Sequence, residues 1–127
     1  MGTFYVECRI ENVSNRAKGA TLPKLLVDTG SEYTWVSKEI LEELGIQREK
    51  TDVEFLMANG QKVKRSVGFA IVRLEKNFTV DEIVFAEKGD LLLLGSRSLE
   101  GLNLTVDLQK KKLVAAGPVP AAQASVE

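Results

Sequence analysis

The sequence predicts an all-β protein, a barrel or a sandwich, with one or two short helices. Apolar residues alternate with polar residues along most of the chain, turn-forming residues separate these segments, and only one segment has clear helical spacing. Because strand follows strand, we expect Greek-key or meander connections. The 127 residues suffice for one domain with a real core. We place this domain at residues 1–116, followed by a flexible tail at residues 117–127 without an apolar period.

Three strands are predicted in the first part of the chain. Residues 4–10 alternate apolar with polar side chains, and residues 12–21 form a polar connection. Pro23 and Lys24 open the second strand, which ends in the apolar run at residues 25–27. Residues 33–36 are rich in strand formers and make a third strand.

The clearest helix is predicted at residues 38–44. Ser37 is a suitable N-cap, and Gly45 provides the stop. The apolar side chains of this segment share one face, which is expected to pack on the core: Ile40, Leu41 and Leu44.

The middle of the chain predicts a long β-hairpin. Two strand-like segments flank residues 58–61, and the Asn-Gly pair between them is the strongest short-range hairpin signal. The returning arm is basic near the tip and then becomes apolar on both faces at residues 68–74. We therefore expect the tip to project into solvent and the base to lie in the interior.

The last third of the chain continues the strand pattern. In the strand at residues 78–85, Asp81 and Glu82 mark either a bulge or an exposed edge. Residues 91–94 are predicted to form a fully apolar strand that ends at Gly95. The remaining elements are expected to be a helical turn at residues 96–101 and two strands at residues 104–108 and 113–114, joined by a turn.

Composition excludes several functions. A formal net charge of -1 with both signs mixed gives no basis for binding nucleic acid or an anionic membrane surface. The absence of His excludes Ser-His-Asp and Cys-His hydrolase chemistry and most zinc sites. The acid–base groups that remain are the carboxylates, Lys, Tyr and Cys8.

The single cysteine and the termini predict a soluble, cytoplasmic protein. One cysteine forms no internal disulfide, which suits a reducing compartment. Cys8 alternates with apolar strand residues and is expected to be buried. The N-terminus has no basic region followed by an apolar stretch, and residues 91–94 are too short to span a bilayer.

The sequence Asp28-Thr29-Gly30-Ser31 directly follows the apolar run of the second strand. A carboxylate at the end of a core strand is costly unless it is hydrogen-bonded or functional. Gly30 permits a sharp turn in which backbone amides point at the carboxylate. The tetrapeptide alone is equally consistent with an ordinary surface turn, since Asp, Gly and Ser all favour turns.

Three features in this order resemble the retropepsin-like (retroviral-type) aspartic proteases, in one of their cellular prokaryotic forms. They are the strand into Asp28-Thr29-Gly30-Ser31, the Asn-Gly hairpin, and Leu93-Leu94-Gly95 followed by a short helix and a terminal strand. The resemblance covers residues 4–114 and implies a closed or partly open β-barrel. The hairpin departs from the retroviral pattern because it is less glycine-rich and carries basic residues.

The resemblance implies an aspartic endopeptidase that is active as a homodimer. The chain has one Asp-Thr-Gly, so a two-fold axis would pair Asp28 with Asp28 of a second subunit. Two such carboxylates share a proton, and one acts as general base on water while the other acts as general acid. No metal or cofactor is required. The implied substrate is an extended peptide or protein segment with apolar side chains near the scissile bond.

Other residues take expected roles from the same resemblance. Thr29 locks the two active-site loops across the dimer, and Gly30 lets amides approach the carboxylates. The Ser31 hydroxyl is expected to hydrogen-bond the catalytic carboxylate. The flap that closes over the substrate would comprise Ala58, Asn59, Gly60 and Gln61.

Structural roles near the site are also implied. Leu94 and Gly95 are expected to pack behind the active-site loop, and Trp35 belongs either to the core or to the substrate cleft. The terminal strands, residues 4–6 and 104–108, are candidates for a sheet between subunits. Unpaired, they would be exposed edges that favour association.

Two other functions remain open. A non-catalytic dimeric peptide-binding module would keep this fold without turnover, although it has no reason to retain a costly carboxylate pair. In an unrelated small β-barrel, Asp28 would only cap a turn and would face solvent.

Overall fold

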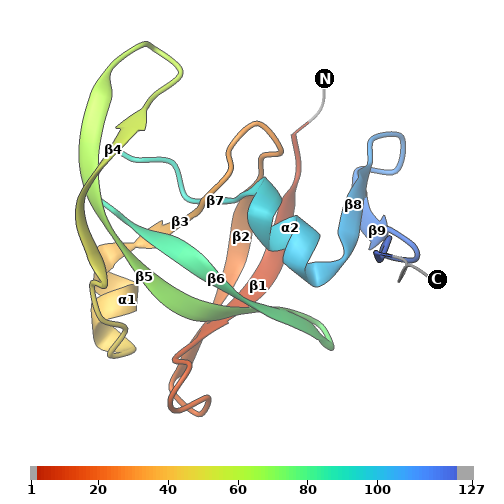
Figure 1. The fold of residues 1–127 in the computed structure, drawn as a ribbon, viewed down its shortest axis with the longest axis horizontal. Helices are drawn as coiled ribbons and strands as arrows, with labels where there is room; N and C mark the ends of the chain where they lie inside the picture. Colours follow the sequence, from red (N-terminus) through yellow and green to blue (C-terminus); the bar gives the residue numbers. More distant parts are fainter. Residues whose placement is uncertain (1–2, 123–127) are drawn as a thin grey trace, which may run out of the picture.

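A computed structural model describes residues 3–122 of the chain. Over these residues it has nine strands and two short helices (Figure 1). In chain order they are β1 (Tyr5–Glu11), β2 (Gly19–Val27), β3 (Thr34–Ser37), α1 (Lys38–Glu43), β4 (Lys50–Leu56), β5 (Lys62–Leu74), β6 (Asn77–Ala86), β7 (Leu93–Leu94), α2 (Ser96–Leu102), β8 (Leu104–Asp107) and β9 (Lys112–Ala115). The predicted all-β class with two short helices is confirmed.

Six strands form a closed circuit of pairings. The main sheet has the order β1-β2-β7-β3-β6-β5-β4, and an additional pairing between β1 and β5 closes the circuit around six of them. β4 pairs with β5 outside this circuit, and β8 and β9 form a separate two-stranded sheet. The six strands form a ring rather than a clean barrel, because β7 contributes only two residues, and this agrees with the closed or partly open barrel that was predicted.

Two parallel pairings bring distant segments of the chain together. β2 runs parallel to β7, with Val27 opposite Leu94, and β3 runs parallel to β6. Since parallel strands point the same way, the segments that follow β2 and β7 leave the sheet side by side. The turn at Asp28 therefore lies against Gly95 and the start of α2.

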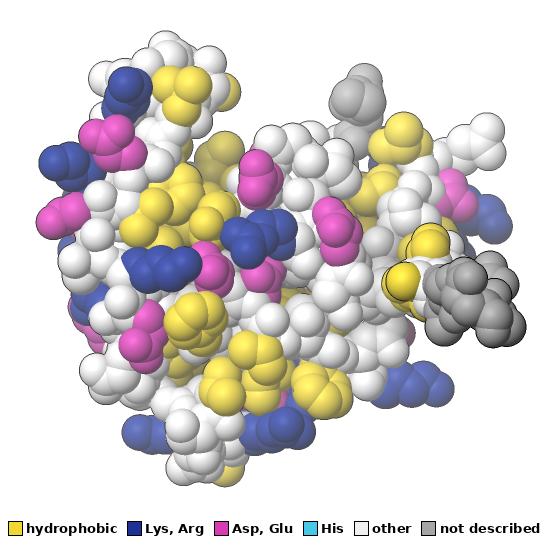
Figure 2. Space-filling model, in the orientation of Figure 1, with side chains coloured by type: hydrophobic (Ala, Val, Ile, Leu, Met, Phe, Trp, Pro, Cys, Tyr) yellow, Lys and Arg dark blue, Asp and Glu magenta, His cyan; other side chains and the backbone are white. Residues whose placement is uncertain are grey.

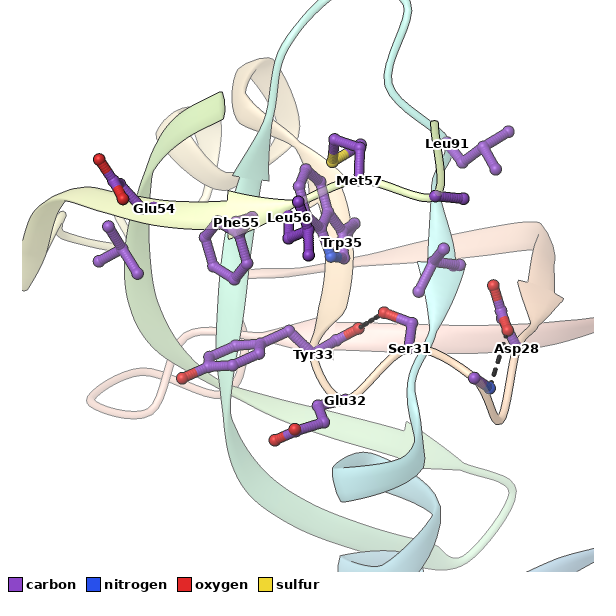
Figure 3. Close-up of a pocket in the computed structure, with 14 residues that line it drawn as sticks. Asp28, Ser31, Glu32, Tyr33, Trp35, Glu54, Phe55, Leu56, Met57 and Leu91 are labelled. Carbon is purple, nitrogen blue, oxygen red and sulfur yellow. Dashed lines mark hydrogen bonds between the residues drawn. The ribbon is translucent and has the colours of Figure 1, made fainter. Parts of the chain in front are cut away.

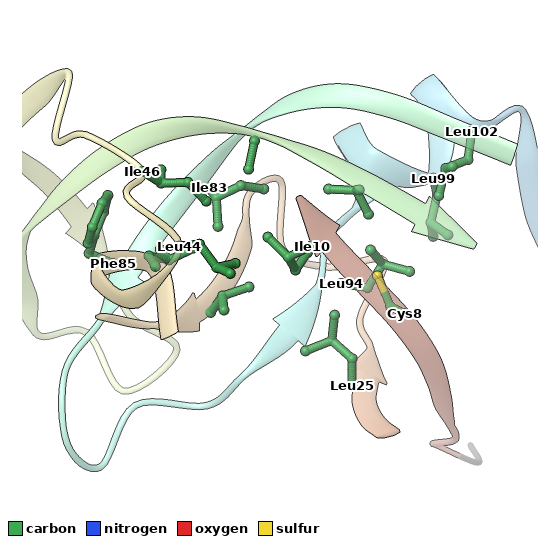
Figure 4. Close-up of a cluster of buried hydrophobic side chains, with 14 of the residues drawn as sticks. Cys8, Ile10, Leu25, Leu44, Ile46, Ile83, Phe85, Leu94, Leu99 and Leu102 are labelled. Atoms are coloured by element: carbon green, nitrogen blue, oxygen red, sulfur yellow. The ribbon is translucent and has the colours of Figure 1, made fainter. Parts of the chain in front are cut away.

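The apolar side chains form two clusters on opposite faces of the sheet. The larger one contains residues of β1, β2, β6 and both helices (Figure 4), and its fully buried members include Ile10, Leu25 and Phe85. Cys8 is buried in this cluster, as predicted. The smaller cluster centres on Trp35 and extends toward β4 and the hairpin. The separation follows from strand geometry, because successive side chains point to opposite faces.

β4 and β5 form the predicted hairpin, and residues 58–61 lie between the two strands as expected. The Gly60 amide donates to the Met57 carbonyl at 2.9 Å, and the Met57 amide donates to the Gln61 carbonyl at 2.8 Å. Gly60 has φ +86°, in the left-handed region, whereas Asn59 does not. The Asn-Gly signal therefore located the hairpin correctly, but the connection is not the two-residue turn that this signal favours.

Both helices begin and end at recognisable residues. The Ser37 hydroxyl accepts a hydrogen bond from the Ile40 amide at 3.3 Å, which confirms Ser37 as the N-cap of α1. Gly45, with φ +73°, follows the end of α1. α2 is longer than the predicted single turn and ends at Asn103, which adopts the left-handed conformation.

Three predicted features of the strands are wrong. β2 begins at Gly19 rather than at Pro23, because the residues before the proline pair with β1. Leu91 and Leu92 are exposed and precede β7, so only the last two residues of the predicted apolar strand pair. Asp81 and Glu82 are neither a bulge nor fully exposed: their register with β5 is regular and both are half-buried.

The two ends of the chain differ from the expected free strands. The Val27 amide donates to the Phe4 carbonyl at 3.0 Å, and residues 5 and 6 pair with β2, so this segment is hydrogen-bonded within the chain. β8 pairs with β9 along one edge. Residues 117–122 form neither helix nor strand, and the rest of the predicted tail, residues 123–127, lies outside the described residues.

The surface carries both charge signs. Acidic and basic side chains are interspersed over the face shown in Figure 2, between patches of apolar atoms. The large apolar residues that are exposed on β5 and β6 are Phe69, Phe78 and Val80. Within residues 3–122, neither helix has the length and apolar character that crossing a membrane requires.

Candidate active site

Asp28 directly follows the last residue of β2 and is held by main-chain hydrogen bonds. Its amide donates to the Leu94 carbonyl at 3.0 Å, and its carbonyl accepts from the Ser31 amide at 3.3 Å. The Gly30 amide donates to the Asp28 Oδ1 atom at 2.9 Å (Figure 3). A Cβ atom on residue 30 would lie 3.2 Å from the same oxygen, so glycine leaves the amide free to approach the carboxylate.

The residues after β7 support this loop from behind. Each of residues 94–97 makes one hydrogen bond to residues 28–34: Leu94 O with Asp28 N at 3.0 Å, Gly95 N with Thr34 Oγ1 at 3.0 Å, Ser96 N with Ser31 O at 2.8 Å, and Arg97 N with Glu32 O at 3.1 Å. A Cβ atom on Gly95 would lie 2.3 Å from the Tyr33 carbonyl oxygen. This contact requires glycine, because no real Cβ approaches an oxygen so closely.

A cleft of about 540 Å³ opens between the Asp28 loop and the hairpin (Figure 3). Its floor comes from Asp28 and residues 30–33, its far wall from residues 53–58 of β4 and the start of the turn, and its third side from Leu91 and Leu93. Asp28 lies at one end of the cleft in Figure 3, and Glu54 lies at the other. The walls between them are predominantly apolar, as is usual for a small-ligand or peptide site.

Three aromatic side chains form a continuous wall. The centroid of the Phe55 ring lies 5.2 Å from the centroid of the Tyr33 ring and 5.2 Å from that of the Trp35 ring. Both pairs have edge-to-face geometry. Such contacts stabilise a fixed arrangement of rings. Trp35 is only 6% exposed and also lines the cleft, so it belongs to both the core and the cleft.

Only part of the predicted flap reaches the cleft. Ala58 lines it, whereas Asn59, Gly60 and Gln61 form the exposed tip beyond it. The Asn59 side chain accepts a hydrogen bond from the Gln61 amide at 2.9 Å, which fixes the shape of the turn.

The two hydroxyl residues of the loop have different environments. The Ser31 hydroxyl donates to the Tyr33 carbonyl at 3.0 Å, rather than to the Asp28 carboxylate as expected. The local turn causes this difference, because it brings the Tyr33 carbonyl back toward residue 31. The Thr29 side chain is exposed at the tip of the loop.

An ion pair connects the hairpin to the loop that carries Leu91. The Arg65 guanidinium on β5 donates to both Asp90 oxygens, at 2.7 and 2.9 Å. The Asp90 side chain is 8% exposed and also accepts from the Glu87 amide at 2.8 Å. The hydrogen bonds from Arg65 hold the pKa of Asp90 below its usual range, despite the opposing effect of burial. This pair fixes one side of the cleft relative to the other.

Charged groups also gather near the Tyr33 end of the cleft. The Arg97 guanidinium lies over the Tyr33 ring, 4.8 Å from its centroid. The hydrogen bond from Lys50 lowers the pKa of Glu82, which also lies 3.9 Å from Arg97. Among residues 3–122, no three side chains of the His, Cys, Asp or Glu types gather in a way that could hold a metal ion.

Sequence reasoning missed several residues of the cleft. Tyr33, Phe55, Met57 and Leu91 line it but were not predicted as site residues. The alternation of residues 53, 55 and 57 was a usable signal, because it placed these apolar side chains on one face of a strand at the base of the flap. Nothing in the sequence distinguished Leu91 from a core residue.

An Asp-Thr-Gly loop that is supported by Leu-Leu-Gly and covered by a β-hairpin, all within a ring of strands, defines a retropepsin-like aspartic protease fold. The family described as "gag-polyprotein putative aspartyl protease" matches residues 15–101. The match covers more than half of the chain, so the chain belongs to this family of aspartyl proteases. No curated protein matches the sequence.

Proposed function

We propose that this protein is an aspartic endopeptidase in which the Asp28 residues of two subunits form one catalytic pair. The observation that carries the proposal is the position of Asp28 at the end of an apolar cleft, with the Gly30 amide donating to its carboxylate. The family match supports the same chemistry. A single chain supplies one Asp-Thr-Gly, and the second carboxylate has to come from another copy.

The proposed reaction needs one ionised and one protonated carboxylate. The ionised Asp28 removes a proton from a water molecule, whose oxygen attacks the peptide carbonyl carbon, while the protonated Asp28 donates to the carbonyl oxygen. The tetrahedral intermediate then collapses: the carboxyl group that received the proton of water donates it to the amine nitrogen as the C–N bond breaks, and the other carboxylate regains its proton from a hydroxyl of the intermediate. Two adjacent carboxylates suit both roles, because their mutual repulsion keeps one of them protonated.

The cleft favours an extended peptide with large apolar side chains. Its aromatic wall, formed by Tyr33, Trp35 and Phe55, would bury such a side chain beside Asp28. The hairpin presents unpaired edge groups of β4, which can hydrogen-bond an extended backbone. Leu56 is 73% exposed on this strand and is available to cover a bound substrate.

Two features support the proposed homodimer. The Thr29 side chain is exposed at the tip of the loop beside Asp28, where a second loop would meet it. β8 is paired only along its β9 edge among the described residues, so its other edge is free to extend a sheet. We expect a dimer at micromolar concentration in sedimentation velocity, and a stable monomer would contradict this part of the proposal.

Cleavage of an unfolded protein by wild type and by Asp28→Ala tests the proposed activity. The assay runs between about pH 4 and pH 7, which brackets the titration of a coupled carboxylate pair. We expect wild type to cleave and the variant to be inactive while it still sediments as wild type does. Equal activity in both would exclude Asp28 as the catalyst. Binding of the unfolded chain by wild type without cleavage would instead support the peptide-binding module.

A further inference from the structure

A chain of buried hydroxyl groups lies behind the Asp28 loop. The Thr34 hydroxyl on β3 and the Ser98 hydroxyl on α2 are 2.6 Å apart, and neither residue is exposed to solvent. Ser98 also donates to the Asp81 Oδ2 atom on β6 at 2.8 Å. At the other end, the Gly95 amide donates to the Thr34 oxygen at 3.0 Å. These hydrogen bonds thus join β3, α2 and β6 to Gly95, which lies between β7 and α2.

The proton positions in this chain follow from its two ends. The Ser98 hydroxyl has one proton, and Ser98 donates it to the Asp81 Oδ2 atom. Thr34 must then donate its own proton to Ser98, because Ser98 has no second proton to give. The Thr34 oxygen is left to accept from Gly95, and all four groups are satisfied in one direction only.

Asp81 is well placed to impose this direction. Its second oxygen, Oδ1, accepts from the Glu82 amide at 2.7 Å, which fixes the orientation of the carboxylate. Packing of α2 on β6 is tight, since a Cβ atom on Gly101 would lie 2.3 Å from the Thr79 hydroxyl. The charged groups near Asp81 are Arg97 on α2 and Glu82, the next residue of β6.

This series of hydrogen bonds ends at Gly95, in the segment that supports the candidate catalytic loop. Gly95 is one of the four consecutive residues that hydrogen-bond residues 28–34, and its neighbour Leu94 holds the Asp28 amide. A change in the Thr34 hydroxyl therefore alters the support of Asp28 without touching the cleft. Neither Ser98 nor Asp81 lines the cleft.

We propose that Asp81 is a positioning residue that acts through Ser98 and Thr34 on Gly95, and so fixes the loop that carries Asp28. This inference rests on the proposed function in its effect on catalysis, but the hydrogen-bond chain itself is independent of it. Asn at position 81 disturbs this order in either orientation. With its NH2 group toward the Glu82 amide, two donors meet; with its NH2 group toward Ser98, the Ser98 hydroxyl has to accept and donate to Thr34, and the Thr34 proton loses Ser98 as its acceptor.

The test is a double-mutant cycle with two readouts. The variants are Asp81→Asn, Ser98→Ala and the double variant, and hydrogen exchange of the Gly95 amide is measured beside kcat and KM. We expect each single variant to lower kcat about tenfold with KM changed less than about twofold. The double variant should be no worse than the poorer single variant, because both changes break the same chain. The Gly95 amide should exchange about tenfold faster in all three.

Thr34 provides the rescue experiment and its control. Thr34→Ser keeps the hydroxyl and should retain kcat, whereas Thr34→Val removes it and should behave as Ser98→Ala does. Thr21→Val, at an exposed position of β2, is the matched control and should resemble wild type. Additive effects of Asp81→Asn and Ser98→Ala, or an unchanged Gly95 exchange rate, would overturn the proposal. If wild type shows no Asp28-dependent cleavage, the proposed function fails, and the exchange rates alone still decide the role of Asp81.

Discussion

The amide of Asp28 donates to the carbonyl oxygen of Leu94 at 3.0 Å, across the parallel strands β2 and β7. Leu94 is fully buried, so the candidate catalytic residue is attached directly to the core. Gly95 follows at once and lies in contact with the backbone on the far side of the loop. The position of Asp28 therefore depends on packing behind the cleft as much as on residues within it.

Replacement of Gly95 by alanine is expected to destabilise the protein. The new Cβ atom would lie 2.3 Å from the Tyr33 carbonyl oxygen and 2.6 Å from that of Glu32, and both are backbone atoms that cannot move alone. Overpacking of this kind costs about 1–3 kcal/mol or more. Urea denaturation measures the free energy of unfolding.

Gly89→Ala is the matched control for this prediction. Gly89 has φ +91° and no atom within 4 Å of its Cβ position, so alanine there meets only backbone strain. That strain costs about 1–2 kcal/mol. If Gly95→Ala lowers the free energy of unfolding no more than Gly89→Ala does, the contact between Gly95 and the Tyr33 carbonyl is not tight.

The pair of Arg65 and Asp90 should make stability depend on acid pH. The pKa of Asp90 is lowered in the folded protein from an ordinary value near 3.8, so its contribution is complete above that value and is lost as the pH falls through the lowered pKa. Asp90→Asn should therefore lose about 1–3 kcal/mol of unfolding free energy at pH 7 and show a flatter dependence below about pH 4.

A second ion pair provides the comparison. Arg48 lies 2.7 Å from Glu42, but both side chains are more than a third exposed. Exposed pairs contribute about 0–1 kcal/mol. Glu42→Gln should therefore change the unfolding free energy little. If Glu42→Gln and Asp90→Asn lower it equally, the pair of Arg65 and Asp90 has no special role in stability.

Cys8 should be unreactive in the folded protein. Burial raises the pKa of its thiol to about 12, so almost no thiolate forms at neutral pH. We expect a thiol reagent such as iodoacetamide to label Cys8 only in denaturant, as followed by mass spectrometry. Labelling of native protein at the rate of a free thiol would mean that β1 opens readily.

Phe55 should affect substrate binding more than chemistry. It joins Tyr33 to Trp35 in the cleft wall, about 5 Å from each in ring centroids. Phe55→Ala is expected to raise KM about tenfold for a peptide with a large apolar side chain, with kcat changed less. Phe78→Ala, at an exposed phenylalanine outside the cleft, is the control. If only kcat falls, Phe55 would act by positioning Asp28 and not by binding the substrate.

Much of the fold could be predicted because its signals are local. The alternation along β1, the N-cap at Ser37 and the Asn-Gly turn each depend on a few adjacent residues. The start of β2 could not be predicted, because residues 19–22 become a strand only through pairing with β1. Leu91 shows the same limit, since an apolar run does not reveal where pairing stops.

The candidate site was predictable in outline. Asp28 stands out as an acid directly after an apolar strand, and the family resemblance indicated Leu94 and Gly95 as the residues behind its loop. The bond from Ser31 to the Tyr33 carbonyl was not predictable, because it depends on the exact path of the loop. The hydrogen-bond chain from Asp81 to Gly95 was equally hidden, since it links residues 34, 81 and 95–98, which are far apart in sequence.

Mixing of subunits tests the shared Asp28 pair most directly. Wild type and Asp28→Asn are denatured together in equal amounts, refolded to exchange subunits, and assayed for peptide cleavage against wild type at the same total concentration. If each active site needs both Asp28 residues, only wild-type dimers work and activity falls to about a quarter. If one chain cleaves alone, activity falls only to about a half, and that result would contradict the account.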